Sequence, residues 1–403
     1  MDTLIEGRIH TAQLYELGEN LIPFSKPDIS TLEIDYVSDA LKNGPVQNGG
    51  SYTKAVEEIL LDLHPTSKAI IATTSGTSAL EMAARLARSG KLGMDLEIIV
   101  PSFAFSSCAN AVYAAGCIPV YADIDLNTLS ISLEEVQKVV TKKTIAIMVI
   151  NYSGVGRDLM ELRVFCDLNG LLLIEDNAHG LGAKVEVIEK GVRMTKTLGT
   201  IGHLSATSFH ATKNIIAGEG GALVINNEEL IDQAFTLKDK GTNRRKFLLG
   251  QTDKYTWVSF GSSYGLSDVN SAVLKAQLER MSIIQQKRRE LWFHYYRELM
   301  DWANELNFRF LNSELSHNSH IFWILTDSRN SRDEFLKHSK LMDVLSTFHY
   351  VPLHSSPFGA QFLRRELPNT DIVGSNLVRL PMASNFTTSE ISQIIEAASS
   401  FRI

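Results

Sequence analysis

Cysteine is scarce in this chain of 403 residues. The three cysteines, Cys108, Cys117 and Cys166, lie in apolar stretches, and none belongs to a Cys-x-x-Cys pair. Their number and spacing indicate neither a disulfide framework nor a zinc site. We therefore expect a reducing compartment and no bound metal.

Long apolar runs and an excess of basic charge are also missing. No stretch approaches the roughly 18 consecutive apolar residues of a membrane span, and the N-terminus lacks a signal-peptide pattern. The formal net charge of -7 leaves no basic surface for nucleic acid. The sequence predicts a soluble cytoplasmic protein that binds neither nucleic acid nor membrane.

The common phosphate-binding loops are absent as well. The chain has no Gly-x-x-x-x-Gly-Lys-Ser/Thr loop and no Gly-x-Gly-x-x-Gly after its first predicted strand. This excludes P-loop nucleotide hydrolases and classical dinucleotide-binding enzymes.

What the chain does contain is a series of seven short apolar runs. They cover residues 69–73, 97–101, 118–122, 145–150, 171–175, 204–209 and 221–225. Helical patterns separate most of the first five runs, which predicts an α/β fold with a mostly parallel seven-stranded sheet flanked by helices. The last two runs have no helix between them, so we expect a different pairing there.

The domain organisation follows from a change in pattern near residue 290. Apolar residues recur at helical spacing from 266 to 296, and a smaller α/β unit follows. We predict an N-terminal extension over 1–20, a large domain over 21–289 and a small C-terminal domain over 290–403.

Lys213 lies on a loop between the last two predicted strands. A rigidly placed and partly desolvated lysine has a lowered pKa and can attack a carbonyl, which makes a Schiff base with pyridoxal phosphate the leading hypothesis. A surface lysine on a hairpin loop is the alternative.

Two ionisable residues follow the fifth run, at the sheet edge where ligands bind in open parallel sheets. Asp176 is either a structural helix cap or the anion that keeps the pyridine nitrogen of pyridoxal phosphate protonated. His179 is either a hydrogen-bond partner of the cofactor ring or a structural histidine.

Other strand ends carry further candidates. The turn over 74–80, which contains Ser78, opens into a helix and is either an ordinary N-cap or a phosphate site. Ser208 offers another phosphate contact. Phe105 is either a stacking partner for a planar ring or a core residue.

These residues match a known family. The chain resembles the DegT/DnrJ/EryC1/StrS sugar aminotransferases from about residue 21 to its end. The segments that carry the resemblance are Ile22-Pro-Phe, the helix entry at Ser78, Glu175-Asp176, Ser208-Phe-His-Ala-Thr-Lys-Asn, Gly218-Glu-Gly-Gly, Lys240-Gly-Thr-Asn-Arg, Asp253-Lys-Tyr-Thr-Trp, Gly261-Ser-Ser-Tyr and 348–354.

The resemblance implies the aspartate-aminotransferase-like fold, pyridoxal 5'-phosphate as cofactor, and a homodimer with shared active sites. It implies Lys213 as the Schiff-base lysine, Asp176 at the pyridine nitrogen and Phe105 under the ring. The phosphate contacts that it implies are Gly76, Thr77, Ser78, Ser208 and, from a second subunit, Ser263. The substrate contacts that we predict are Lys240, Arg244, Tyr255, His349, Tyr350 and His354.

Two positions depart from the family pattern. Asn177 stands where relatives often have alanine, which predicts a bulkier polar group beside the ring, and Ser263 stands where many relatives have asparagine.

The resemblance further implies amino transfer from L-glutamate to the 4-keto group of a dTDP-4-keto-6-deoxyhexose. The product would be dTDP-4-amino-4,6-dideoxygalactose or a close relative, used in surface polysaccharide synthesis. One alternative is amination at C3 or on another nucleotide sugar. A pyridoxal-phosphate-dependent sugar dehydratase, which typically has histidine at the lysine position, and a non-catalytic cofactor-binding protein are less favoured.

Overall fold

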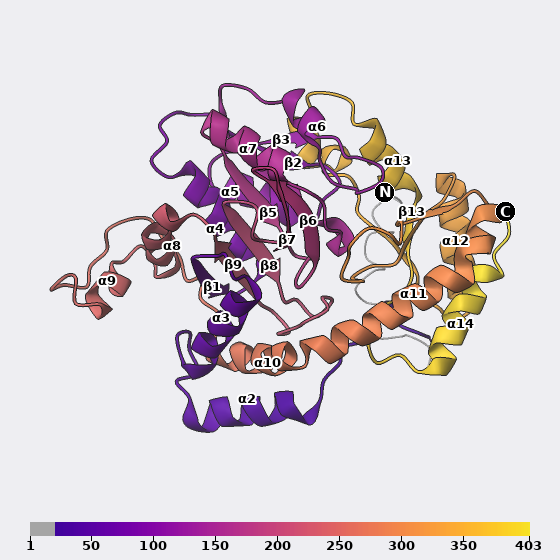
Figure 1. Ribbon diagram of the computed structural model, residues 1–403, viewed down its shortest axis with the longest axis horizontal. Helices are drawn as coiled ribbons and strands as arrows, with labels where there is room; N and C mark the ends of the chain where they lie inside the picture. Colours follow the sequence, from indigo (N-terminus) through magenta and orange to yellow (C-terminus); the bar gives the residue numbers. More distant parts are fainter. Residues whose placement is uncertain (1–20) are drawn as a thin grey trace, which may run out of the picture.

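A computed structural model describes residues 21–403 (Figure 1). The predicted extension over 1–20 lies outside the described residues. The described part is an α/β structure with a seven-stranded sheet in the order β1-β9-β8-β5-β4-β2-β3. The strands are β1 Ala69–Thr73, β2 Glu97–Pro101, β3 Ile118–Ala122, β4 Thr144–Ile150, β5 Leu172–Asp176, β8 Leu204–Ser208 and β9 Gly221–Ile225.

The seven predicted strands are confirmed. β8, β5, β4, β2 and β3 pair in parallel. β9 is antiparallel to both of its neighbours, β1 and β8. The chain passes from β8 to β9 without a helix, so the local change of pairing is also as expected. Every residue of β2, β4 and β9 is buried, which explains their continuous apolar character.

Helices join most of the parallel strands and cover the sheet (Figure 1). α4 opens with the N-cap Ser75 and packs against α5 and against β8 and β9. The helices of this part are α2 Thr31–Asn43, α3 Ser51–Leu63, α4 Gly76–Arg88, α5 Ser106–Ala114, α6 Leu133–Gln137, α7 Met160–Asn169, α8 Ile231–Lys238 and α9 Arg244–Leu248.

One hairpin was not predicted. Strands β6 Lys184–Glu189 and β7 Val192–Thr197 form an antiparallel pair between β5 and β8 in the chain. Its outer face is solvent-exposed, with charged residues alternating with buried Val185 and Val187. The alternation of apolar and polar residues that is typical of a strand was therefore present in the sequence, but most of the residues in this segment are polar.

The expected single helix over 266–296 is wrong in detail. The structure has α10 Asp268–Glu279 and then α11 Met281–Glu305. Arg280, between the two helices, donates to Asp28 at 2.6 Å and to Glu33 at 2.6 Å. Those partners come from the beginning of the chain, so helical spacing of apolar residues could not reveal the break.

The C-terminal part is built on a second, four-stranded sheet in the order β10-β11-β13-β12. α11 continues through position 290 without interruption, so the domain boundary there stays a prediction. The elements are β10 Arg309–Phe310, β11 Trp323–Leu325, α12 Arg329–Leu341, β12 Thr347–Phe348, α13 Pro368–Asn376, β13 Leu377–Arg379 and α14 Thr388–Ser399.

The first described residues pack against this C-terminal part. Ile22 forms a parallel bridge with Val344, and the carbonyl of Phe24 accepts a hydrogen bond from the amide of Met382 at 3.2 Å. The first residues of the described chain therefore pack as part of the C-terminal unit.

Candidate active site

Lys213 lies in the turn that follows the carboxyl end of β8. The amide of Ala211 donates to Gly218 at 2.9 Å and the amide of Ala217 donates to Phe209 at 2.7 Å, so the ends of the turn are tied together. The next residue, Asn214, is buried and accepts from a ring nitrogen of His320 at 2.6 Å. The lysine is therefore carried on an anchored backbone.

The environment of Lys213 favours its neutral amine. Burial lowers the pKa of Lys213 to about 8, the Asp176 carboxylate opposes the shift, and the Arg379 guanidinium adds to it. A lowered pKa leaves part of the amine unprotonated near neutral pH, and only that form is a nucleophile or a proton acceptor.

Asp176 ends β5, the strand that pairs in parallel with β8. Its side chain is 6% exposed, and its two oxygens accept from the amide of Ala178 and from the thiol of Cys108, each at 3.0 Å. Burial raises the pKa of Asp176, while these two donors and Lys213 act in the opposite direction. A buried carboxylate with so little compensation favours a cationic partner such as a protonated pyridine nitrogen.

The N-terminus of α4 forms a cradle beside Ser208. Ser75 is the N-cap, and its hydroxyl accepts from the amide of Ser78 at 3.0 Å. A Cβ atom on Gly76 would lie 2.8 Å from the Cβ of Ser208, and a Cβ on Gly221 would lie 2.4 Å from the backbone of Ser75. The structure thus brings two predicted segments together at a helix N-terminus, a place that suits an anion.

The hydroxyls in this cradle contact one another. Ser78 Oγ lies 2.8 Å from Thr74 Oγ1, and Thr77 Oγ1 lies 2.7 Å from Ser107 Oγ. Hydroxyls rotate at little cost, so these donors can turn toward a phosphate.

Aromatic residues surround the space beyond the lysine. Phe105, at the N-cap of α5, is 61% exposed and lies 6.4 Å from Tyr350, whereas Phe103 is fully buried. The exposed face of Phe105 is free to stack on a planar ring, and its place under the cofactor ring stays a prediction.

His179 is held in one tautomer. Its Nδ1 accepts from the amide of Ser153 at 3.3 Å, so the ring proton is on Nε2. Burial lowers the pKa of His179 well below its usual value, and the Lys213 and Arg379 charges add to this effect. The imidazole is neutral and can donate one hydrogen bond from Nε2.

The predicted residues near 350 separate into two groups. His349 lies 2.8 Å from the hydroxyl of Tyr152 through Nδ1, and Tyr350 packs against Phe103. His354 instead has partners for both ring nitrogens within the chain. Its two ring nitrogens contact Ser102 at 2.7 Å and Asp371 at 3.0 Å, so it links the sheet to α13 without any substrate.

Three of the predicted substrate residues lie on a projecting excursion of the chain. The predicted phosphate contact Ser263 follows that excursion and precedes Tyr264, whose carbonyl accepts from the amide of Thr74 at 2.9 Å. Lys240, Arg244 and Tyr255 belong to an excursion, residues 240–262, whose helix α9 projects from the body of the molecule (Figure 1). Ser263 is exposed and bridges Asp239. Its hydroxyl has no hydrogen-bond partner among residues 21–403, and Ser267 is the N-cap of α10.

The local geometry fits pyridoxal phosphate. Gly76 and Gly221 let the start of α4 approach Ser208 and β9 closely, so its free backbone amides and the Ser208 hydroxyl form one group of donors that suits a phosphate. Asp176, a buried carboxylate, is one strand away from Lys213. Ser78, Ser208, Asp176, His179 and Lys213 would hold the cofactor, with Phe105 against its ring.

A model of the DegT/DnrJ/EryC1/StrS aminotransferase family matches residues 27–399. The chain belongs to this family. It is therefore an aminotransferase, and the expectations of an enzyme and of pyridoxal phosphate as its cofactor are confirmed at the level of the family.

Similar proteins cover nearly the whole chain. The uncharacterised protein MJ1066 of Methanocaldococcus jannaschii is 27% identical over 94% of this chain and 97% of its own. Helicobacter pylori PseC, an aminotransferase involved in the biosynthesis of pseudoaminic acid, has a TM-score of 0.83 at 24% identity, covering 94% of this chain and 98% of its own. A structure described as "Putative sugar aminotransferase Spr1654 from Streptococcus pneumoniae, PMP-form" has a TM-score of 0.81 at 23% identity, covering 94% of this chain and 98% of its own. These structural likenesses bear on the fold.

The expectation that Asn177 places a polar group beside the cofactor ring is wrong. Asn177 does not lie beside the ring position, because successive strand residues point to opposite faces. Its amide contacts Asn151 at 2.9 Å and the carbonyl of Leu198 at 3.1 Å. Glu175, on the same face, is fully buried and accepts four hydrogen bonds, three of them from the backbone before β8.

Several site residues were missed because only the fold brings them near Lys213. Cys108 lies one helical turn after Phe105. This spacing was the only feature of the sequence that could have indicated its place in the site. Tyr152, His320 and Arg379 come from three separate segments and carry no local motif.

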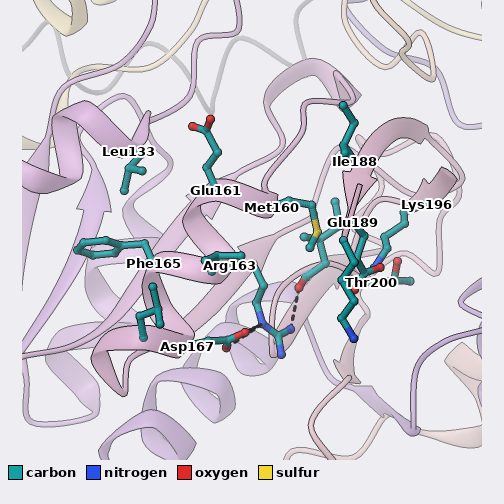
Figure 2. A pocket seen from close by; sticks show the side chains of 14 residues that line it. Leu133, Met160, Glu161, Arg163, Phe165, Asp167, Ile188, Glu189, Lys196 and Thr200 are labelled. Carbon is teal, nitrogen blue, oxygen red and sulfur yellow. Dashed lines mark hydrogen bonds and ion pairs between the residues drawn. The ribbon is translucent and has the colours of Figure 1, made fainter. Parts of the chain in front are cut away.

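A separate surface cavity of about 740 Å³ lies between α7 and the β6–β7 hairpin (Figure 2). Ile201 and Asp167 line it just before β8 and β5 begin, at the sheet edge opposite Lys213. Its ionic side chains are largely paired, since Arg163 contacts Asp167 at 3.0 Å and Lys196 contacts Glu189 at 2.7 Å. It is not the aminotransferase site.

Two general features complete the description. No helix within residues 21–403 is both long and apolar enough to cross a membrane. Over the same residues, no group of three or more histidine, cysteine, aspartate or glutamate side chains is arranged to hold a metal ion.

Proposed function

We propose that this aminotransferase moves an amino group from L-glutamate to the 4-keto group of a dTDP-4-keto-6-deoxyhexose. The product would be dTDP-4-amino-4,6-dideoxygalactose or a close relative. The main supporting observation is the pair formed by Lys213, with a pKa of about 8, and the buried Asp176 on the adjoining strand. The solved relatives that are named as sugar aminotransferases support a keto sugar as acceptor.

Pyridoxal phosphate, when bound, supplies an aldehyde that joins to amines and a ring that accepts electrons from a substrate carbon. Lys213 would hold the cofactor through its Nζ until the amine of the donor is bound. Its Nζ is then free to take the proton from the α-carbon of glutamate. In the second half of the reaction the same atom gives a proton back on the way to the amino sugar.

The other residues set the charge and the orientation. Asp176 would keep the pyridine nitrogen protonated, and Nε2 of His179 would donate to the ring hydroxyl. Ser78 and Ser208 would bind the phosphate beside the N-terminus of α4. Phe105 would cover one face of the ring and exclude water from it.

Another acceptor of the same class is the strongest alternative. A sugar with its keto group at C3, or one linked to a different nucleotide, would use the same residues around Lys213. A sugar dehydratase is less favoured, because the lysine that such enzymes typically replace by histidine is present. A non-catalytic protein is less favoured, because the lowered pKa of Lys213 provides a neutral amine that can act as a nucleophile and as a proton acceptor.

The decisive experiment is a panel assay. Purified enzyme with L-glutamate is tested against nucleotide-linked 3-keto and 4-keto sugars, and NMR identifies the carbon that becomes aminated. Lys213→Ala is the control, because it removes the proton carrier. Borohydride treatment of the native protein should fix the cofactor to the peptide that contains Lys213. Amination at C3 only, or labelling of another lysine, would contradict the proposal.

We also propose a homodimer whose active sites are shared. Several large apolar side chains of the 240–262 excursion are exposed, among them Leu248 at 67%, Trp257 at 78% and Phe260 at 58%. Apolar surface of this extent favours burial against another protein surface. A second copy would cover it and would place Ser263, Lys240, Arg244 and Tyr255 of one chain near Lys213 of the other.

Coexpression of inactive variants tests the shared site. Ser263→Asp should place a like charge near the phosphate of the partner's site, and Lys213→Ala disables its own site. Mixed dimers of the two should regain one complete site and part of the activity. The matched control pairs Lys213→Ala with Asp176→Asn, because these residues belong to one chain's site and cannot complement. Verified mixed dimers without activity would contradict the shared site.

A further inference from the structure

Residues 316–321 precede β11 and lie as a strap against segments that follow β4 and β5. The carbonyl of Ser316 accepts from the amide of Gly156 at 2.7 Å, and the hydroxyl of Ser316 donates to the carbonyl of Lys184 at 2.6 Å. These contacts join the strap to the part of the chain that contains the large sheet.

Helix α11 holds the same strap through two side chains. A terminal nitrogen of Arg288 donates to the carbonyl of His320 at 2.7 Å, and Nε1 of Trp292 donates to the carbonyl of Ile321 at 3.1 Å. Both donors are buried. The backbone of the strap is therefore fixed at the position where the His320 side chain leaves it.

Asn318 ties the strap to the segment that carries His179. Its Nδ2 donates to the carbonyl of His179 at 2.7 Å and to the carbonyl of Leu181 at 3.0 Å. A Cβ atom on Gly154 would lie 1.9 Å from Asn318 Oδ1, and Gly154 has a φ of 71°, so glycine is required for this close approach. The strap is thus firmly seated beside the site.

His320 extends from the strap to the turn that carries Lys213. Its Nδ1 lies 2.6 Å from Oδ1 of Asn214, and both side chains are buried. Nδ2 of Asn214 donates to the carbonyl of Asn318 at 3.4 Å, which leaves Oδ1 as the acceptor and places the proton of His320 on Nδ1. Burial lowers the pKa of His320 well below its usual value, and the charges of His179 and Lys213 add to this effect. The ring is neutral, and its one proton is used on Asn214.

The middle of the Lys213 turn has no other distant hydrogen-bond partner in the described chain. Between residues 211 and 216, the only hydrogen bonds to a distant segment among residues 21–403 are the two made by the side chain of Asn214. The amide of Lys213 itself donates to the nearby carbonyl of His210 at 2.9 Å. The place of the lysine backbone therefore depends on the strap.

We propose that His320 is a positioning residue of the aminotransferase, which sets the place of Lys213 by holding Asn214. The Nζ of Lys213 has to reach both the cofactor and the proton of the donor carbon, and a misplacement of about 1 Å can cost about 100-fold in rate. His320 acts through Asn214, because its only proton is committed there. This inference rests on the proposed transfer from glutamate through Lys213.

The kinetic test follows the first half-reaction of the holoenzyme with glutamate by absorbance, without any sugar. In His320→Leu the rate at saturating glutamate should fall about 100-fold, whereas the glutamate concentration at half-saturation should stay unchanged. His320→Asn should remain close to wild type, because its amide nitrogen takes the place of Nδ1. His320→Gln places its amide nitrogen where Nε2 lies and should be as slow as His320→Leu.

A double variant tests whether His320 acts through Asn214. Asn214→Ala alone should slow the same step about 100-fold, because the turn loses the same anchor. If the two residues form one unit, Asn214→Ala combined with His320→Leu should be no slower than the slower single variant. Independent roles would multiply to about 10,000-fold, and that result would overturn the inference.

Hydrogen exchange gives a readout that does not depend on turnover. In the full-length protein before cofactor is added, the amides of the 209–218 turn should exchange faster in His320→Leu and at the wild-type rate in His320→Asn. His64→Leu is the matched control. His64 is also buried, and its Nδ1 lies 2.7 Å from the carbonyl of Leu60 at the end of α3. Its loss should leave both the exchange of the turn and the half-reaction unchanged.

The two readouts separate this inference from the proposed function. If wild type does not convert glutamate, the proposed donor is wrong, and exchange of the 209–218 turn still tests His320. An unchanged turn in His320→Leu, or a His320→Asn protein as slow as His320→Leu, would show that His320 does not position Lys213.

Discussion

Replacing Lys213 by methionine should stabilise the cofactor-free protein while abolishing turnover. Methionine keeps a long unbranched side chain but has no charge to desolvate. Burial lowers the pKa of Lys213 from 10.5 to about 8, and each pKa unit corresponds to 1.36 kcal/mol. The charged lysine therefore costs the folded state about 3 kcal/mol, which the variant recovers.

The stability difference between Lys213→Met and the wild type should depend on pH in a known direction. The folded-state pKa is below the unfolded one, so between about pH 8 and 10.5 the unfolded chain binds more protons than the folded chain. Wild-type stability then rises with pH over this window, whereas the variant has no such term. The advantage of Lys213→Met should be complete at pH 7 and should disappear as the pH approaches 10.5.

The assay is urea unfolding of both cofactor-free proteins at pH 7 and at pH 10. Lys138→Met serves as control, because Lys138 is exposed and the hydrogen bonds that it donates to Glu134 and Glu135 raise its pKa. That variant should gain no stability at either pH. A Lys213→Met protein that is no more stable than wild type at pH 7, or whose advantage does not change with pH, would refute the reasoning.

Three other changes test neighbouring contacts. Asp176→Asn should slow turnover by orders of magnitude while cofactor binding, measured by absorbance, weakens little, because only the charge is lost. Cys108→Ala removes a donor to that carboxylate and should slow turnover about tenfold, the effect of losing a hydrogen bond to a charged group, whereas Cys108→Ser should be nearly normal in the same kinetic assay. Gly221→Ala should weaken cofactor affinity in equilibrium dialysis and lower stability by about 1–3 kcal/mol, because its Cβ would meet the backbone of Ser75 at 2.4 Å.

The parts of the fold that local sequence determines were predictable. The seven strands of the large sheet are buried on both faces, so each appears as a short apolar run. Lys213 and Asp176 follow two such runs, and parallel strands bring their carboxyl ends to one edge. Their proximity therefore follows from the alternation of strands and helices.

What could not be predicted depends on contacts between distant segments. The break at Arg280 needs Asp28 and Glu33, which are about 250 residues away along the chain. Arg379 contacts Phe348 and Phe24 only because β13 pairs with β12 and lies beside the first described residues. No spacing or composition marks such contacts, since they belong to the folded surroundings.

The pairing of the chain's beginning with its C-terminal part has a consequence for how the protein is made. The carbonyl of Phe24 accepts a hydrogen bond from the amide of Met382, and Ile22 forms a parallel β-bridge with Val344. At roughly 5–20 residues per second of synthesis, these early residues wait roughly 20–70 s for their partners to leave the ribosome. The large sheet can form during that interval, while the Ile22-Pro-Phe segment still lacks its partners Val344 and Met382. This early segment is thus among the last to find its place, and it brings Phe24 to Arg379 only when nearly all of the 403 residues have been synthesised.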